Sequence, residues 1–121
     1  MSNSISLGIV QCALGEEREA NVARVEALVR VAAAQGAQIV LTPELFEGPY
    51  FPQTEEESAF DRATPVEGHP TIARMQALAK ELGVVLPVSF FERDGHNHFN
   101  SVAIIDADGT QLGVYRKSHI P

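Results

Sequence analysis

The sequence has one cysteine, no tryptophan and few basic residues. The single cysteine, Cys12, cannot form an internal disulfide, which agrees with a reducing compartment. No apolar run approaches the roughly 18 residues that a membrane-spanning helix needs, and the first residues lack the basic and apolar segments of a signal peptide. We therefore expect a cytoplasmic protein that does not bind membranes.

The shortage of positive charge also restricts the partners. Nine Lys and Arg residues face sixteen Asp and Glu residues in 121 positions, which gives a formal net charge of −7. This charge repels phosphate backbones, so nucleic acid is not an expected partner, whereas a cationic small molecule is compatible with it. Because 45% of the residues are hydrophobic and 21% are charged, the composition predicts a globular domain with a core.

The first part of the chain has the pattern of a βαβ unit. Residues 5–10 are almost all apolar or small, which predicts a strand buried on both faces. Residues 16–35 carry apolar side chains at helical spacing, and Gly36 is placed to end that helix in a left-handed conformation. Residues 39–41 predict a second strand.

The second part predicts another helix and a hairpin. Residues 47–67 contain prolines, glycines and the acidic run 55–57, which is typical of a long loop. A helix is expected from Pro70 to a stop at Gly83. Strands follow at 84–91, 101–105 and 111–115, with an Asp-Gly turn before the last one. The whole pattern predicts an α/β fold with helices covering a mixed sheet.

Two charged residues come directly after predicted strands. Glu44 follows residues 39–41 and Lys117 follows residues 111–115, and the carboxyl edge of an α/β sheet is where ligand sites lie. Neighbouring apolar side chains would bury Glu44 and raise its pKa, as a general base requires. Glu44 could instead be the N-cap of a helix or a loop, and Lys117 could be solvated surface. A functional role is better supported for the two residues together than for either alone, because the sheet would bring both strand ends to one edge.

Several segments resemble a known family in the same order along the chain. Residues 41–44 and 115–119 resemble the segments that carry the catalytic glutamate and lysine of nitrilase-superfamily carbon–nitrogen hydrolases. Further segments resemble the members of that superfamily that act on carbamoyl amines: 45–51, 69–72, 87–92 and 104–110. The resemblance runs from near Ile5 to Pro121.

The resemblance implies an α-β-β-α sandwich in a homo-oligomer, with no cofactor and no metal. It implies a cysteine, glutamate and lysine triad in which Glu44 is the general base and Lys117 stabilises the oxyanion. The implied substrate is a linear, cationic carbamoyl amine, above all N-carbamoylputrescine, with putrescine, CO2 and ammonia as products. Tyr50 and Phe51 could line the pocket for the aliphatic chain, and the acidic run 55–57 could attract the cation.

The sequence departs from the family pattern at one point. The nucleophilic cysteine of the family follows the lysine segment, and the chain ends before such a residue. We therefore expect residues 1–121 to be the amino-terminal part of a carbon–nitrogen hydrolase domain, inactive alone, with Cys12 a small core residue rather than a substitute nucleophile. A partner chain could supply the cysteine, or the chain could be a complete binding module that has lost the chemistry.

Other motifs point elsewhere but weakly. Residues 104–110 resemble the aspartate-nucleophile motif of phosphatases, with Asp106 as the nucleophile, although a hairpin turn is the favoured interpretation. A calcium loop is excluded, since its twelfth position would be Lys117. His96 and His98 could chelate a metal but are expected in a polar turn. His69 and His119 could contact substrate.

Overall fold

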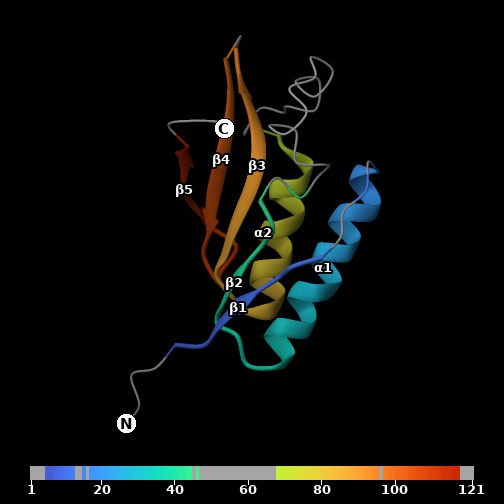
Figure 1. The fold of residues 1–121 in the computed structure, drawn as a ribbon. Coiled ribbons are helices and arrows are strands. Elements are labelled where there is room, and N and C mark those ends of the chain that lie inside the picture. Colours follow the sequence, from blue (N-terminus) through green and yellow to red (C-terminus); the bar gives the residue numbers. More distant parts are fainter. Residues whose placement is uncertain are drawn as a thin grey trace.

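The computed structural model describes residues 5–12, 15, 17–44, 46, 68–95 and 97–117. The whole of the predicted loop 47–67 lies outside these residues. The described elements follow one another as β1 (Leu7–Ile9), α1 (Arg18–Ala34), β2 (Ile39–Leu41), α2 (Pro70–Leu82), β3 (Leu86–Asp94), β4 (Asn97–Ile105) and β5 (Gln111–Arg116). Figure 1 shows them as one layer of strands and one layer of helices.

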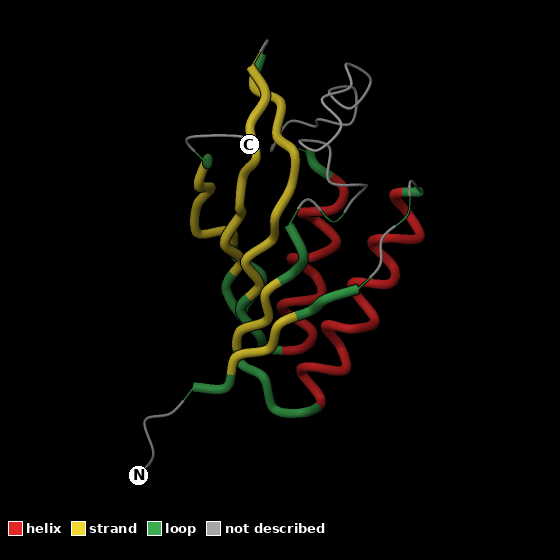
Figure 2. Tube along the Cα trace, in the orientation of Figure 1, coloured by secondary structure: helices red, strands yellow, loops and turns green. Residues whose placement is uncertain are grey.

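The five strands form a mixed sheet, as predicted. β1 and β2 are parallel, and β3, β4 and β5 form an antiparallel meander. A parallel bridge between Ile39 and Val85 joins the two parts. There the Val40 N–H donates to the Val85 carbonyl over 3.0 Å, and the Val85 N–H donates to the Gln38 carbonyl over 2.9 Å. The strand order is therefore β1-β2-β3-β4-β5 (Figure 2).

Both helices pack on the same face of the sheet (Figure 1). The core between the layers consists of valines from α1, Met75 and Leu78 from α2, and alternate residues of the strands. Gly8 lets α1 come close to β1, because a Cβ at this position would lie 3.1 Å from the Cβ of Ala37 and 3.2 Å from that of Ala32. A strand residue with a side chain would push the helix away.

The other face of the sheet is open among the described residues. Leu7 is 57% exposed and Ile9 is 63% exposed, whereas Gly8 between them faces the helix layer. The prediction that residues 5–10 form a strand buried on both faces is therefore wrong. β1 is an edge strand covered by a helix on one side only, so its residues alternate between covered and exposed.

The helix ends follow the predicted signals. Gly36 and Gly83 have φ values of 98° and 66°, which is the left-handed region that glycine enters without strain. Pro70 lies in the first turn of α2, where its missing N–H costs nothing. His69 precedes it, and its Nδ1 accepts from the N–H groups of Thr71 and Ile72 over 3.2 and 3.4 Å. His69 is thus the buried N-cap of α2.

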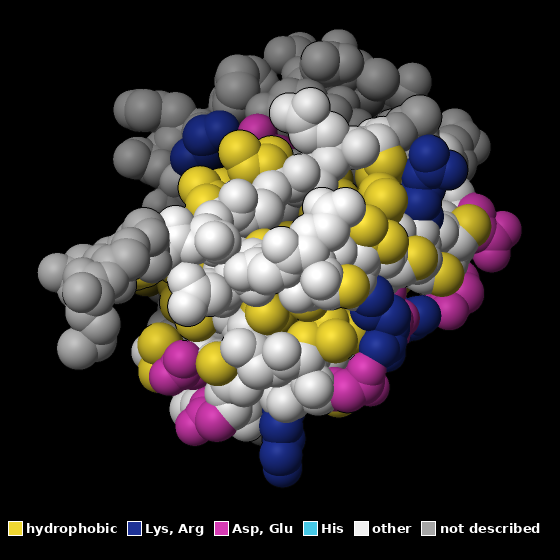
Figure 3. Space-filling view, turned by 90° about the horizontal axis from the view of Figure 1, so that it is seen from below, with side chains coloured by type: hydrophobic (Ala, Val, Ile, Leu, Met, Phe, Trp, Pro, Cys, Tyr) yellow, Lys and Arg dark blue, Asp and Glu magenta, His cyan; other side chains and the backbone are white. Residues whose placement is uncertain are grey.

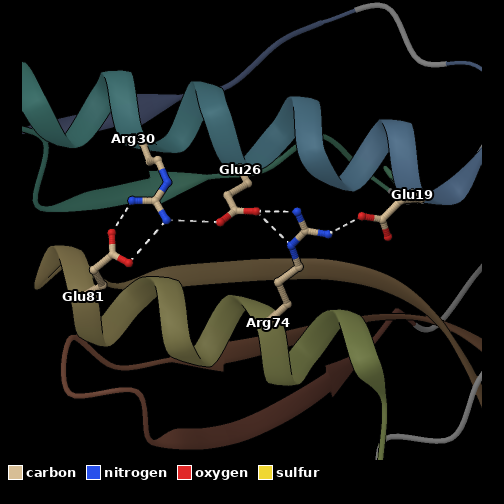
Figure 4. A network of polar contacts seen from close by, with 5 residues as sticks. All are labelled: Glu19, Glu26, Arg30, Arg74 and Glu81. Carbon is tan, nitrogen blue, oxygen red and sulfur yellow. Dashed lines mark hydrogen bonds and ion pairs between the residues drawn. The ribbon is translucent and has the colours of Figure 1, made fainter.

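The two hairpins differ from the prediction in length only. β3 starts two residues later than predicted and continues to Asp94, and β4 starts four residues earlier than predicted. The turn between them contains Gly95, with a φ of 62°, but it is shorter than expected, because His98 lies in β4 and not in the turn. Ion pairs link the exposed sides of α1 and α2 (Figure 4). On the face seen in Figure 3, acidic and basic side chains are interspersed, with hydrophobic ones exposed between them.

Candidate functional site

Glu44 and Lys117 meet at one edge of the sheet. The Lys117 Nζ lies 2.9 Å from the Glu44 Oε1, although 73 positions separate the two residues. The topology explains this proximity: β3 is parallel to β2, and two antiparallel steps make β5 parallel to β3. The chain segments that follow β2 and β5 therefore leave the sheet at the same edge, and the predicted proximity is confirmed.

Thr42 connects the end of β2 to β3 by side-chain hydrogen bonds. Its Oγ1 donates to the carbonyl of Pro87 over 3.3 Å and accepts from the N–H of Ser89 over 3.4 Å. These contacts continue the link between the strands beyond the last backbone hydrogen bond. Glu44 comes two residues later and is thereby held over β3 and β4.

Asn100 touches both members of the pair from the middle of β4. Its side-chain Nδ2 donates to the Glu44 Oε1, and its backbone carbonyl accepts from the Lys117 N–H over 2.8 Å. Only 2% of Asn100 is exposed. Sequence reasoning missed this residue, although a buried amide inside a largely apolar strand is the kind of signal that could have revealed it.

A pocket of about 420 Å³ opens beside these groups on the uncovered face of the sheet. Its walls are mostly apolar, and its polar lining includes the Glu44 carboxylate, the Asn100 amide and the Lys117 ammonium. The apolar part comes from Leu41, Pro87, Val102 and Tyr115. Such a hollow can hold an aliphatic chain while its polar end presents a carboxylate and a cation side by side.

The predicted burial of Glu44 is wrong. Its side chain is 43% exposed and that of Lys117 is 48% exposed. The carboxylate lies in a turn beyond β2, held by an ammonium and an amide rather than by apolar packing. Among the described residues, Glu44 directly precedes no helix, and the half-exposed Lys117 is ion-paired.

A second polar cluster lies on the helix side of the same strands. The buried Glu92 accepts from the Ser101 hydroxyl over 2.8 Å and from two nitrogens of Arg116 over 3.0 and 2.7 Å. Arg116 also pairs with Asp94 and stacks on Phe99, with its guanidinium carbon 4.2 Å from the ring centre. The Arg116 hydrogen bonds are the main reason why the pKa of Glu92 lies below its ordinary value.

Comparison with known proteins identifies the family. The carbon–nitrogen hydrolase family model matches residues 6–121. The chain belongs to the carbon–nitrogen hydrolase family. It is 62% identical to an N-carbamoylputrescine amidase of Arabidopsis thaliana over 112 residues, covering 93% of this chain and 38% of the relative. It is 42% identical to a citrullinase of Francisella tularensis over 118 residues, covering 98% of this chain and 41% of that relative.

A solved structure supports the same family and fold. The carbon–nitrogen hydrolase of Helicobacter pylori G27 superposes with a TM-score of 0.86 at 32% sequence identity, covering 97% of this chain and 40% of that one. The predicted α/β class, built as the amino-terminal part of a nitrilase-type fold, is confirmed. The chain thus spans about two fifths of the length of these relatives.

In this carbon–nitrogen hydrolase chain, Asp106 and Asp108 serve the turn between β4 and β5. Asp106 Oδ1 accepts from the Ala107 N–H over 2.7 Å, and Asp108 Oδ1 accepts from the Thr110 N–H over 2.8 Å. The hairpin interpretation is confirmed, and with it the phosphatase reading of Asp106 loses its support. Cys12 is partly buried against the core, as predicted, and is not among the residues that line the pocket.

The remaining predicted site residues are placed as follows. His69 is buried as a helix cap against Phe90, with the ring centres 5.2 Å apart. The predicted substrate contacts Tyr50 and Phe51, the acidic run 55–57, His96 and His119 lie outside the described residues. Within the described part of the chain, no three His, Cys, Asp or Glu side chains cluster as a metal site, and neither helix is long and apolar enough to cross a membrane.

Proposed function

We propose that this chain supplies Glu44 and Lys117 to the active site of an enzyme that hydrolyses N-carbamoylputrescine to putrescine, CO2 and ammonia. The observation that carries the proposal is the carboxylate and ammonium pair, 2.9 Å apart, at the polar end of a largely apolar pocket. The similarity to the Arabidopsis thaliana N-carbamoylputrescine amidase supports the choice of substrate.

The ureido group is the chemical feature on which we base the substrate class. N-carbamoylputrescine and citrulline both carry a ureido group at the end of an alkyl chain, and relatives named for each are at least 42% identical to this chain. The apolar walls of the pocket suit the alkyl chain, and the acidic net charge of −7 favours a cationic substrate.

The proposed reaction has two steps. A cysteine thiol from outside these 121 residues loses its proton to Glu44, and the thiolate attacks the ureido carbon. The C–N bond to the terminal nitrogen breaks, and this nitrogen takes the proton from Glu44 and leaves as ammonia. Glu44 then takes a proton from water, which attacks the carbamoyl thioester and releases the thiol and a carbamic acid. The carbamic acid loses CO2 to give putrescine.

Lys117 stabilises the negative charge in both steps. Each attack turns the carbonyl oxygen into an oxyanion, and an ammonium at the pocket is a fixed positive charge for it. The pairing with Glu44 orients the ammonium before substrate arrives. A fixed charge at the reacting carbon lowers the barrier more than a mobile one, because little reorganisation remains to be done.

The test uses the native gene product that contains these residues and measures ammonia and putrescine released from N-carbamoylputrescine. We expect Glu44→Gln to lower kcat by about 10²- to 10⁴-fold, as for loss of a general base, and Lys117→Met by about 10²- to 10³-fold. Glu81→Gln is the matched control, since Glu81 is also an exposed glutamate in an ion pair. Turnover by Glu44→Gln equal to that of the control would contradict the proposal.

A further inference from the structure

Asn100 lines the pocket as a buried residue with a defined hydrogen-bond partner, unlike an amide on the protein surface. Its carboxamide is buried on the pocket face of β4, at 2% exposure, and its Nδ2 points at the Glu44 Oε1. The orientation of the amide follows from the partner, because an ionised carboxylate can only accept hydrogen bonds. The donor nitrogen must therefore face Glu44.

The backbone of the same residue fixes the other member of the pair. The Asn100 carbonyl accepts from the Lys117 N–H over 2.8 Å, which prolongs the pairing of β4 with β5 by one residue beyond Arg116. One position on β4 thus touches the turn after β2 through its side chain and the segment after β5 through its backbone.

The Glu44 Oε1 receives two donors, the Asn100 amide and the Lys117 ammonium. Two fixed donors on one oxygen define the direction of the carboxylate more narrowly than one ion pair between partly exposed side chains does. The other charged side chain at the pocket, Arg116, directs its guanidinium to Glu92 and Asp94. Asn100 of β4 and Lys117, directly after β5, both face Glu44.

We propose that Asn100 is a positioning residue that aims the Glu44 carboxylate and keeps it in register with Lys117. The inference rests on the proposed function of this pair and deepens it: Asn100 acts through Glu44 and makes no bond to the reacting atoms. Its amide stabilises the charged form of the carboxylate, so its removal affects both the direction of Glu44 and the pH at which Glu44 can accept a proton.

The test compares Asn100→Ala and Asn100→Asp in the native gene product that contains these residues. Alanine removes the donor, and aspartate keeps the shape but sets a second carboxylate against Glu44. We expect both to lower kcat by about 10²-fold with little change in KM, the scale expected for a misplaced catalytic group. We also expect the rising limb of the pH profile to move to higher pH, further for aspartate than for alanine.

The matched control is Asn21→Asp. Asn21 is also buried, and its amide is also hydrogen-bonded, but to the backbone of Gly15 before α1. This substitution should lower the unfolding temperature and leave the pH profile unchanged. A crystal structure of the Asn100→Ala variant adds a readout that is independent of turnover, and in it the Glu44 carboxylate should leave Lys117.

The outcomes separate the two proposals. An Asn100→Ala variant with an unchanged pH profile, an unchanged kcat and an intact Glu44–Lys117 pair would overturn the positioning role, even where Glu44→Gln lowers kcat as expected. If Glu44→Gln retains turnover, the proposed function fails instead. An intact Glu44–Lys117 pair in the Asn100→Ala crystal structure contradicts the positioning role even when no turnover is measurable.

Discussion

Glu92 is a buried carboxylate with 4% of its side chain exposed. Its hydrogen-bond partners compensate for the lost hydration of its charge. Ser101 and Arg116 donate to both of its oxygens, and these bonds offset the cost of removing the charge from water. Because Arg116 directly precedes Lys117, the cluster also fixes the end of β5 from the helix side. The end of β5 is thereby fixed directly before Lys117, the residue that lines the pocket.

We predict that Glu92→Gln lowers the free energy of unfolding by about 1–3 kcal/mol near neutral pH, the usual cost of losing hydrogen bonds to a buried charged group. The folded pKa of Glu92 is lowered from the ordinary 4.5, mainly by Arg116. Its contribution is therefore complete above the unfolded pKa and is lost as the pH falls through the folded one. Urea titrations should show the deficit of the variant shrinking from about pH 5 toward pH 3, and a constant deficit would contradict this.

Residue types and their places after strands were enough to predict that Glu44 and Lys117 would meet. The same reasoning did not find Asn100 or Glu92. Their importance comes from the strand register, which pairs Ser101 with Arg116 and Phe91 with Asn100, and no local pattern specifies that register. The exposure of Glu44 was mispredicted because its side chain, in a turn after β2, stays 43% exposed.

At the scale of elements, α1 and α2 are joined by a line of alternating charges (Figure 4). Glu26 lies at its centre, 2.6 Å from one nitrogen of Arg74 and 3.2 Å from one of Arg30. Glu19 extends the line at one end and Glu81 at the other. Glu26 pairs with Arg30 of its own helix through Oε1 and with Arg74 of α2 through Oε2.

We expect Glu26→Gln to lower the melting temperature more than Glu81→Gln, because it leaves two arginines with fewer partners instead of one. Both losses should be small, as for surface ion pairs, and should diminish in 1 M NaCl, where the Debye length is about 3 Å. Thermal unfolding of both variants at low and high salt checks this. Equal shifts for the two variants would mean that the central glutamate does not couple the helices.

The helices could be predicted more closely than the strands. α2 carries Pro70 at its start and Gly83 at its end, and both signals act within one turn of the chain. Strand limits depend on the neighbouring strand: β3 extends to Asp94 because β4 accompanies it as far as Asn97. The sequence of a strand alone therefore does not show where the strand ends.

For the molecule as a whole, the open face of the sheet is an apolar surface among the described residues. Leu7, Ile9 and Tyr115 are exposed there. Exposed apolar surface of this kind favours association with other surfaces. We predict that the isolated 121-residue polypeptide binds a hydrophobic dye and self-associates, and that Leu7→Thr combined with Ile9→Thr reduces both.

Val31→Thr is the control for this pair, since Val31 is equally an exposed aliphatic residue but lies on α1. Light scattering and dye fluorescence at matched concentrations are the measurements. If Val31→Thr reduced association as much as the double variant, the association would not depend on the sheet face.

The 73 positions between Glu44 and Lys117 also set an order in time. Each strand pairing from β2 to β5 must be complete before the carboxylate and the ammonium can meet, and contacts between such distant residues form late in folding. β5 is the last of these strands to leave the ribosome. A nascent chain will therefore bury much of the core described here before Glu44 and Lys117 can meet, and the formation of their ion pair will report the docking of β5.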